Sequence, residues 1–308
     1  MCEAGAFECL ASDRKMRYNE TRKNTEEEYP LSILSQLLDE TTRLQALISL
    51  LYRLPAVLIA LTLHELAHGY VALRCGDPTA QMLGRLSFNP LRHLDPIGTV
   101  CMFLLGVGWA KPVPVNPRNF RNYRRDDLLV SLAGVVVNFL LFVFATLLML
   151  LMTEFLYKPE MWDLGGLTTR RDFLRFDGYN FRLAYTNESL IAVAKAKPGY
   201  IFTAELAGYL KTPWLQYVQR FLMDFSMVNI GLALFNLLPV PPLDGYHVFN
   251  DILFRGRLHV PARVMNFLSF ALLVLIFATD VVSDLMGNAI FFVQGGLVDG
   301  LLKLFGVG

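Results

Sequence analysis

The sequence predicts an α-helical integral membrane protein with about four to six transmembrane helices, a short re-entrant or β-hairpin segment and a small extramembrane insertion. Three observations lead to this fold class. Hydrophobic residues make up 54% of the 308 residues and charged residues only 18%, which is more apolar than a typical soluble domain. The apolar residues are concentrated in a few long stretches, and about twenty of them form a helix that crosses a bilayer core of about 30 Å. Charged segments separate these stretches.

Composition also excludes several classes of protein. The 28 Lys and Arg residues nearly balance the 27 Asp and Glu residues, so we expect no nucleic-acid partner, because such binding depends on many phosphate contacts. The four cysteines have no CxxC spacing, which disfavours a zinc ribbon or a disulfide framework. Because the long apolar stretches are typical of membrane-spanning helices, the lipid bilayer is the expected partner of the chain.

Residues 1–45 are predicted to form a soluble N-terminal extension that leads into an amphipathic helix. Residues 1–30 mix charges of both signs without an apolar run, so we predict no secretory signal peptide there. Leu31 to Leu51 carries Leu and Ile at helical spacing with charged residues between them, which is typical of an amphipathic helix.

Residues 46–153 are predicted to form the first part of the membrane core. Leu54 to Leu73 is one candidate span, and Leu128 to Thr153, which has no charged residue, is the second. Between them, Ile97 to Trp109 is apolar but too short to cross a bilayer. This length favours a re-entrant segment or a hairpin buried in protein.

Residues 154–213 are predicted to be an extramembrane insertion, with alternating stretches that could form a small β-containing domain. Residues 214–261 should form the second part of the core, with a third span at Phe221 to Leu238.

Residues 262–308 are predicted to contain the C-terminal membrane helices. Val264 to Met286 is the fourth candidate span. Ala289 to Phe305 is interrupted by glycines and carries two charges, so it could lie at the membrane interface.

Basic residues predict the orientation in the membrane. The connection from Arg74 to Asp127 carries eight basic and four acidic residues, and short basic connections face the cytoplasm. We therefore expect a multi-pass protein of the cell membrane whose functional site faces the cytoplasmic side. Residues 154–213 carry eight basic residues of their own, which weakens this assignment, although long loops report orientation poorly.

The first span carries the chemically most informative residues, His64, Glu65 and His68. On a helix, the spacing of four places both imidazoles on one face, where they can hold one metal ion. Glu65 lies beside them and can take a proton from a metal-bound water, as in zinc-dependent peptide hydrolysis. Ionisable residues inside an apolar span are costly and are usually functional.

A catalytic zinc site usually has three protein ligands, and Asp244 is the best candidate for the third. It follows a run of prolines after the third span and precedes Gly245, a frame that ends a helix and turns the chain sharply. His247 is the competing ligand. The remaining histidines, His93 and His259, lie in basic loops and are expected at the surface.

These residues lie within longer recognisable segments. HELAHGYVALRCGDPTAQMLGRLSFNPLRHLDPIGT begins at His64, GWAKPVPVNPRNFRN follows, and SLAGVVVNF and NLLPVPPLDG come later in the chain. With them the chain resembles the site-2 protease family of intramembrane zinc metalloproteases, in particular the compact bacterial members without a PDZ domain. The resemblance covers roughly residues 50–150 and 215–260.

The resemblance implies a zinc ion held by His64, His68 and Asp244, with Glu65 as general base. It implies hydrolysis of a peptide bond within or next to a transmembrane segment, and we expect the substrate to be a single-span membrane protein. It also implies that Asn236 holds the substrate or stabilises the developing oxyanion, as a side-chain amide can. The alternative role for Asn236 is to bond a carbonyl group at the helix end.

One departure from the family pattern lies in the second span, where Val135 occupies a position that is commonly proline. Loss of proline straightens a helix locally. Asn138, which the chain retains, could bond the active-site loop or hold neighbouring helices together. We expect a substrate helix to enter laterally and unwind near residues 97–115, because a helical peptide bond is shielded by its own turn.

Three other functions remain to be weighed against proteolysis: a catalytically silent relative that binds membrane helices, a metal transporter, and a membrane metallohydrolase of another specificity. Retention of all three expected ligands and of Glu65 argues against a silent relative. A single buried site with a glutamate base would be unusual in a transporter. The other glutamates that could serve a different hydrolase lack the proline-glycine frame of Asp244.

Overall fold

The structure is a computed structural model that describes residues 43–96, 98, 110–156, 158–159, 210–258, 260–279 and 281–306. The chain forms two compact units, one of residues 1–48 and 95–109 and the other of residues 49–94 and 110–308. Nearly all of the described residues belong to the second unit. Within them the regular structure is helical, which confirms the predicted class of α-helical membrane protein.

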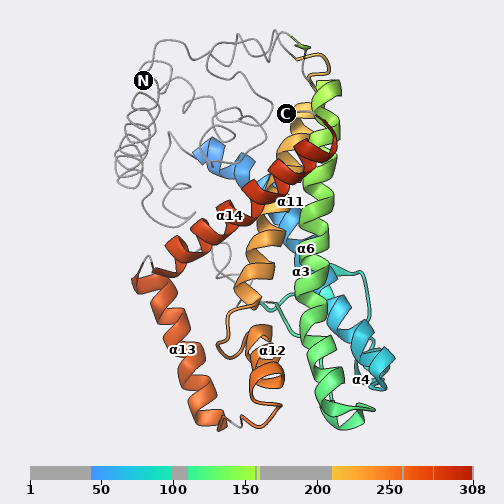
Figure 1. Cartoon of the computed structure of the whole chain (residues 1–308), viewed down its shortest axis with the longest axis vertical. Coiled ribbons are helices and arrows are strands. Elements are labelled where there is room, and N and C mark those ends of the chain that lie inside the picture. Colours follow the sequence, from blue (N-terminus) through green and yellow to red (C-terminus); the bar gives the residue numbers. More distant parts are fainter. Residues whose placement is uncertain are drawn as a thin grey trace, which may run out of the picture. The chain divides into compact units, whose positions relative to one another are not determined.

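Four of the described helices are long and apolar enough to cross a membrane: α3, α6, α11 and α14. Figure 1 shows the arrangement of the helices. In chain order the elements are α3 (Arg43–Cys75), α4 (Thr79–Met82), the short 3-10 helices η1 (Pro90–Arg92) and η2 (Pro117–Asn119), α6 (Tyr123–Leu156), α11 (Leu215–Asn236), α12 (Asp244–Leu253), α13 (Ala262–Ala278) and α14 (Val281–Leu304).

Local sequence sets the facing ends of α3 and α6. After α3 the chain turns at Gly76, whose φ of 108° suits glycine, and a Cβ atom there would lie 3.0 Å from the carbonyl oxygen of Asn119. Before α6, the side-chain oxygen of Asn122 accepts a hydrogen bond from the backbone N–H of Arg125 at 3.3 Å. Asp126 accepts one in return from the backbone N–H of Asn122 at 2.8 Å, so the helix start is capped reciprocally.

The core lies where α3, α6 and α11 pack together. α6 and α11 run side by side (Figure 1) and pack extensively against each other. Thr146 of α6 and Ser226 of α11 also share a buried hydrogen bond of 3.3 Å between their hydroxyl groups, which joins the two helices where water is excluded. The buried apolar cluster at this junction consists of Ala56, Ala145, Met149, Leu222 and Phe225.

The C-terminal helices differ from the predicted ones. The predicted fourth span, Val264 to Met286, is wrong, because α13 ends at Ala278 and Thr279 has extended backbone angles. The sequence ATDVVSD at this point is rich in β-branched and short polar residues, which have low helix propensity. α14 then continues without a break through most of the stretch from Ala289 to Phe305 and ends at Leu304. Its residues Asp284–Leu304 are long and apolar enough to cross a membrane.

Several predicted segments lie largely outside the described residues, namely the N-terminal extension, the apolar segment from Ile97 to Trp109 and the insertion at 154–213. The two flanks of the apolar segment are described: Leu94 and Ala110 form an antiparallel bridge. The backbone N–H of Lys111 also donates to the carbonyl oxygen of His93 at 2.8 Å. The residues that enter and leave this apolar segment therefore lie side by side.

The prediction that His93 lies at the surface is wrong. Its side chain is only 1% exposed, and its Nε2 atom lies 2.7 Å from the carbonyl oxygen of Ser87. Residues 84–94 fold back on themselves, so the ring lies against the carbonyl oxygen of Ser87. A local charge pattern does not reveal this folding. His259 lies outside the described residues.

Candidate metal centre

Two separate helices bring three potential metal ligands together. His64 and His68 lie one turn apart on α3, and Asp244 is the first residue of α12. The two Nε2 atoms are 3.0 Å apart, and Oδ2 of Asp244 lies 3.3 Å from each of them. The residues are the only group of at least three His, Cys, Asp or Glu side chains in the described part of the chain that could hold a metal ion.

The donor atoms fit zinc in both chemistry and spacing. Two imidazole nitrogens and one carboxylate oxygen form an open three-ligand set of the kind found in catalytic zinc sites. Tetrahedral bonds of about 2.0 Å place two ligand atoms about 3.3 Å apart, close to the distances between these donors. Oδ2 of Asp244 is buried yet has no hydrogen-bond partner of good geometry among the described residues. A buried carboxylate oxygen in this state needs a cation.

The chain between α11 and α12 delivers Asp244 to the imidazoles. α11 ends at Asn236, and the proline-rich segment that follows reverses the chain before α12 begins. Gly245 permits a close approach to the end of α11, because a Cβ atom there would lie 2.3 Å from the carbonyl oxygen of Leu237. Burial by itself raises the pKa of Asp244, but the two nearby imidazoles outweigh burial and hold this pKa below its ordinary range.

Glu65 is buried beside the metal ligands and is fixed by the segment that follows the apolar stretch. Its Oε2 atom accepts a hydrogen bond from the backbone N–H of Val113 at 2.8 Å. This segment lies close to α3 because Gly69 has no side chain: a Cβ atom there would lie 2.9 Å from Cγ1 of Val113. We call residues 110–116, which are non-helical, the edge segment.

Two charged side chains, one before α4 and one after it, anchor the edge segment. Asp77 is fully buried and accepts hydrogen bonds from the backbone N–H of Asn116 and from the side chain of Asn119, each at 2.7 Å. These bonds and those from Thr79 outweigh burial, which acts in the opposite direction, and lower the pKa of Asp77. Arg85 donates to the carbonyl oxygen of Lys111 at 2.9 Å.

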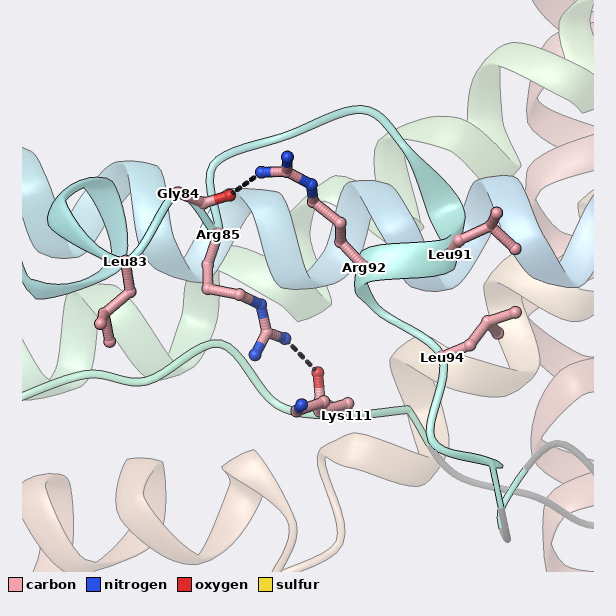
Figure 2. Close-up of a pocket in the computed structure, with 7 residues that line it drawn as sticks. All are labelled: Leu83, Gly84, Arg85, Leu91, Arg92, Leu94 and Lys111. Atoms are coloured by element: carbon pink, nitrogen blue, oxygen red, sulfur yellow. Dashed lines mark hydrogen bonds between the residues drawn. The ribbon is translucent and has the colours of Figure 1, made fainter.

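A basic pocket of about 400 Å³ lies beside Lys111, a residue of the edge segment that lines it (Figure 2). Its three cationic side chains are those of Arg85, Arg92 and Lys111. Both guanidinium groups are hydrogen-bonded to backbone carbonyl groups, that of Arg85 to Lys111 and Pro112 and that of Arg92 to Gly84. The arginines therefore hold the pocket wall and the edge segment in place.

Helix α6 lies against the far side of the two imidazoles. Nδ1 of His68 is 2.7 Å from the carbonyl oxygen of Val130, and Nδ1 of His64 is 3.3 Å from the amide nitrogen of Asn138. Gly134 lies between these contacts, and a Cβ atom there would lie 2.5 Å from atoms of both rings. The sequence predicted no role for Val130 or Gly134, because a backbone carbonyl group and a missing side chain have no distinctive chemistry in a sequence.

Two further candidate residues have hydrogen-bond partners outside the ligand group. The amide of Asn236 donates to the carbonyl oxygen of Leu232 at 3.0 Å, one turn back on its own helix. His247, the alternative ligand, lies with its Nδ1 atom 3.3 Å from Oδ2 of Asp127 on α6. That contact raises the pKa of His247, and burial opposes it. Val135 lies within α6, which is an uninterrupted helix.

Comparison with known proteins places this geometry in a family. A family model described as peptidase family M50 matches residues 52–279, a range that contains all three ligand candidates and Glu65. The chain belongs to peptidase family M50. This result confirms the resemblance to the site-2 proteases.

Named relatives of this M50 chain agree with the family match. A Bacillus subtilis protein named "Putative zinc metalloprotease YwhC" is 33% identical over 254 residues, which cover 82% of this chain and 90% of the relative. A Mycolicibacterium smegmatis protein named "Putative zinc metalloprotease Rip2" is 29% identical over 200 residues, 57% of this chain and 74% of the relative. No solved structure matches the chain. The M50 chain is thus an intramembrane zinc metalloprotease of the site-2 type.

Proposed function

We propose that this M50 protease hydrolyses a peptide bond within or next to the transmembrane segment of a single-span membrane protein, with His64, His68 and Asp244 as zinc ligands and Glu65 as general base. One observation carries the proposal: the carboxylate of α12 lies 3.3 Å from the Nε2 atoms of both imidazoles of α3. The buried carboxylate of Glu65 neighbours this group in sequence and structure.

The proposed chemistry divides between the metal and the protein. A bound zinc ion lowers the pKa of a coordinated water toward neutrality and polarises the carbonyl group to be cleaved. Glu65 takes a proton from the attacking water and passes it to the leaving amine. The N–H of Val113 holds one carboxylate oxygen of Glu65 at 2.8 Å, which orients the base and leaves its other oxygen for the proton transfer.

Asn236 is our candidate for stabilising the negative charge that develops on the carbonyl oxygen. It ends α11, eight residues before Asp244, and its amide group has two N–H donors. One of them bonds the carbonyl oxygen of Leu232, which leaves the second for a substrate. A side-chain amide in this role contributes by binding the oxyanion more strongly than the carbonyl group.

The edge segment supports lateral binding of an unwound substrate. A transmembrane helix must lose its own backbone hydrogen bonds before a peptide bond can be attacked. The edge segment is non-helical over residues 110–116 and contacts Glu65 through Val113. It therefore lies beside the general base, which an unwound, extended substrate must reach. The basic connection between α3 and α6 supports a site that faces the cytoplasm of the cell.

The proposal is tested with purified protein in vesicles and in cells. The variant Glu65→Gln should bind zinc with wild-type affinity and show wild-type thermal stability but should lose cleavage, because the amide cannot accept the proton. The variant His68→Ala should lose zinc as well. Membrane-protein fragments that accumulate with the wild type and not with Glu65→Gln, as measured by mass spectrometry, would identify substrates.

Two results would contradict this proposal. Cleavage by Glu65→Gln at the wild-type rate would remove Glu65 as the base. Identical fragment patterns from the wild type and both variants would instead favour a silent helix-binding relative.

A further inference from the structure

Each imidazole of the metal centre has a second ring nitrogen, and both of these atoms point to α6. Nδ1 of His68 contacts the carbonyl oxygen of Val130 at 2.7 Å, and Nδ1 of His64 contacts the side-chain amide of Asn138 at 3.3 Å. Val130, Gly134 and Asn138 are spaced four residues apart, so they lie along one face of the helix. We call this row of three residues the α6 stripe.

Metal binding fixes the proton on each ring. An imidazole that binds through Nε2 is neutral and carries its proton on Nδ1, where it needs an acceptor. The carbonyl oxygen of Val130 meets this need for His68. His64 instead faces the amide nitrogen of Asn138, which is also a donor, while the amide oxygen is buried with no hydrogen-bond partner in the described part of the chain.

A half-turn of the Asn138 amide removes both conflicts. It places the amide oxygen against Nδ1 of His64, where the oxygen accepts a hydrogen bond from the Nδ1–H group and so gains the partner that it lacked. The side chain is fully buried, so water cannot serve as the acceptor from outside.

We propose that Asn138 is a positioning residue whose amide oxygen accepts the Nδ1–H of His64 and holds this ring ready to bind the metal through Nε2. Together with the carbonyl oxygen of Val130, it makes the α6 stripe a template for both imidazoles. This inference rests on the ligand set given under the proposed function. Asn138 does not touch the substrate, and its effect passes through His64.

The environment of Asn138 favours this role over helix packing. The described hydrogen bond between α6 and α11 is made by Thr146 and Ser226, away from the metal centre. The hydrogen bond described for Asn138 goes to the ring of a metal-ligand candidate. Gly134 is part of the same arrangement, because its missing side chain allows α6 to lie directly against both rings.

The test measures zinc affinity of the purified full-length protein by competition with a chelator. Asn138→Leu keeps the approximate shape but has no acceptor, and we expect a 10- to 100-fold loss of affinity, the range found for partners of metal-binding histidines. Asn138→Asp supplies a carboxylate acceptor, and its affinity should return to within a few fold of wild type.

Asn229→Leu is the matched control. Asn229 is also fully buried, donates to a carbonyl oxygen on its own helix and has an amide oxygen without a partner among the described residues. It should affect thermal stability as Asn138→Leu does but leave zinc affinity unchanged. The absorption spectrum of the cobalt-substituted protein reports ligand geometry and should change only for the Asn138 variant.

The possible failures are distinguishable. Wild-type zinc affinity in Asn138→Leu would overturn the positioning role, and so would an equal loss of zinc affinity in Asn229→Leu. In both cases His68→Ala would still abolish zinc binding, so the ligand set would stand. Failure of Asn138→Asp to restore affinity in a folded protein would overturn the acceptor role. If Asn138→Asp does not fold, Asn138→Ala replaces it in the test. Wild-type zinc affinity in Asn138→Ala would then overturn the acceptor role, and a loss of affinity like that of Asn138→Leu would support it. Zinc binding that survives His68→Ala as well would overturn the ligand set itself.

Discussion

Gly134→Ala is a small change that tests the metal centre directly, because the added atom meets the two imidazoles themselves. The added Cβ atom would lie 2.5 Å from Cε1 of His64, 2.6 Å from its Nε2 and 2.5 Å from Nε2 of His68, where ordinary contacts begin at 3.4 Å. Each contact must therefore open by about 0.9 Å, by movement of α6 or of both rings. Metal–ligand distances tolerate deviations of only about 0.2 Å. A misplacement of about 1 Å can reduce activity about 100-fold, or about 2.7 kcal/mol of transition-state stabilisation.

The assay for this variant combines zinc content, zinc affinity and cleavage of a membrane substrate in vesicles. Gly296→Ala on α14 is the control, because a Cβ atom there meets nothing within 4 Å. We expect Gly296→Ala to retain zinc and activity. Wild-type zinc affinity and cleavage in Gly134→Ala would refute the reasoning, since the helix and rings could then separate without cost to the site.

Three further predictions concern the supports of the site. Gly245→Ala should lower zinc affinity at least 10-fold in a chelator competition, because its Cβ atom would lie 2.3 Å from the carbonyl oxygen of Leu237; unchanged affinity would contradict this. Burial has the largest effect on Asp251 and the negative charge of Asp127 the second largest, and together they raise the pKa of Asp251 to about 6. The native state thus binds more protons than the unfolded state between about pH 4 and pH 6, so this group makes stability fall as pH rises through that window. Asp251→Asn should therefore reduce the difference in Tm between pH 5 and pH 7, by roughly 2–4 °C, and an unchanged difference would reject the assignment. Arg85→Met should lower cleavage several-fold while zinc content stays constant, because the edge segment loses its bond at the carbonyl group of Lys111; full activity would show that this bond is dispensable.

The sequence carried most of the information on the metal ligands because their side chains have distinctive chemistry. His64, Glu65 and His68 have helical spacing in an apolar span, and Asp244 follows a proline run at the same expected depth. The structure brings the three ligand atoms together within 4.8 Å. The positions of the main membrane helices were likewise predictable from long apolar runs.

The remaining features depend on backbone groups and on contacts distant in sequence. The carbonyl oxygen of Val130 has no sequence signature, and the importance of Gly134 comes from the atoms that it lacks. His93 lies in a basic loop but is buried, because burial follows from how the loop folds. The helix break after Ala278 was missed since the apolar residues continue beyond it, and hydropathy does not register backbone direction.

The order of the ligands along the chain has a consequence for biosynthesis. The two imidazoles belong to α3, whereas the carboxylate arrives only with α12, after α6 and α11. With the proposed ligand set, a ribosome-bound chain that has already inserted α3, with Glu65, still lacks the third metal ligand, Asp244. The newborn protease therefore stays inert beside other nascent membrane proteins until translation has passed Asp244.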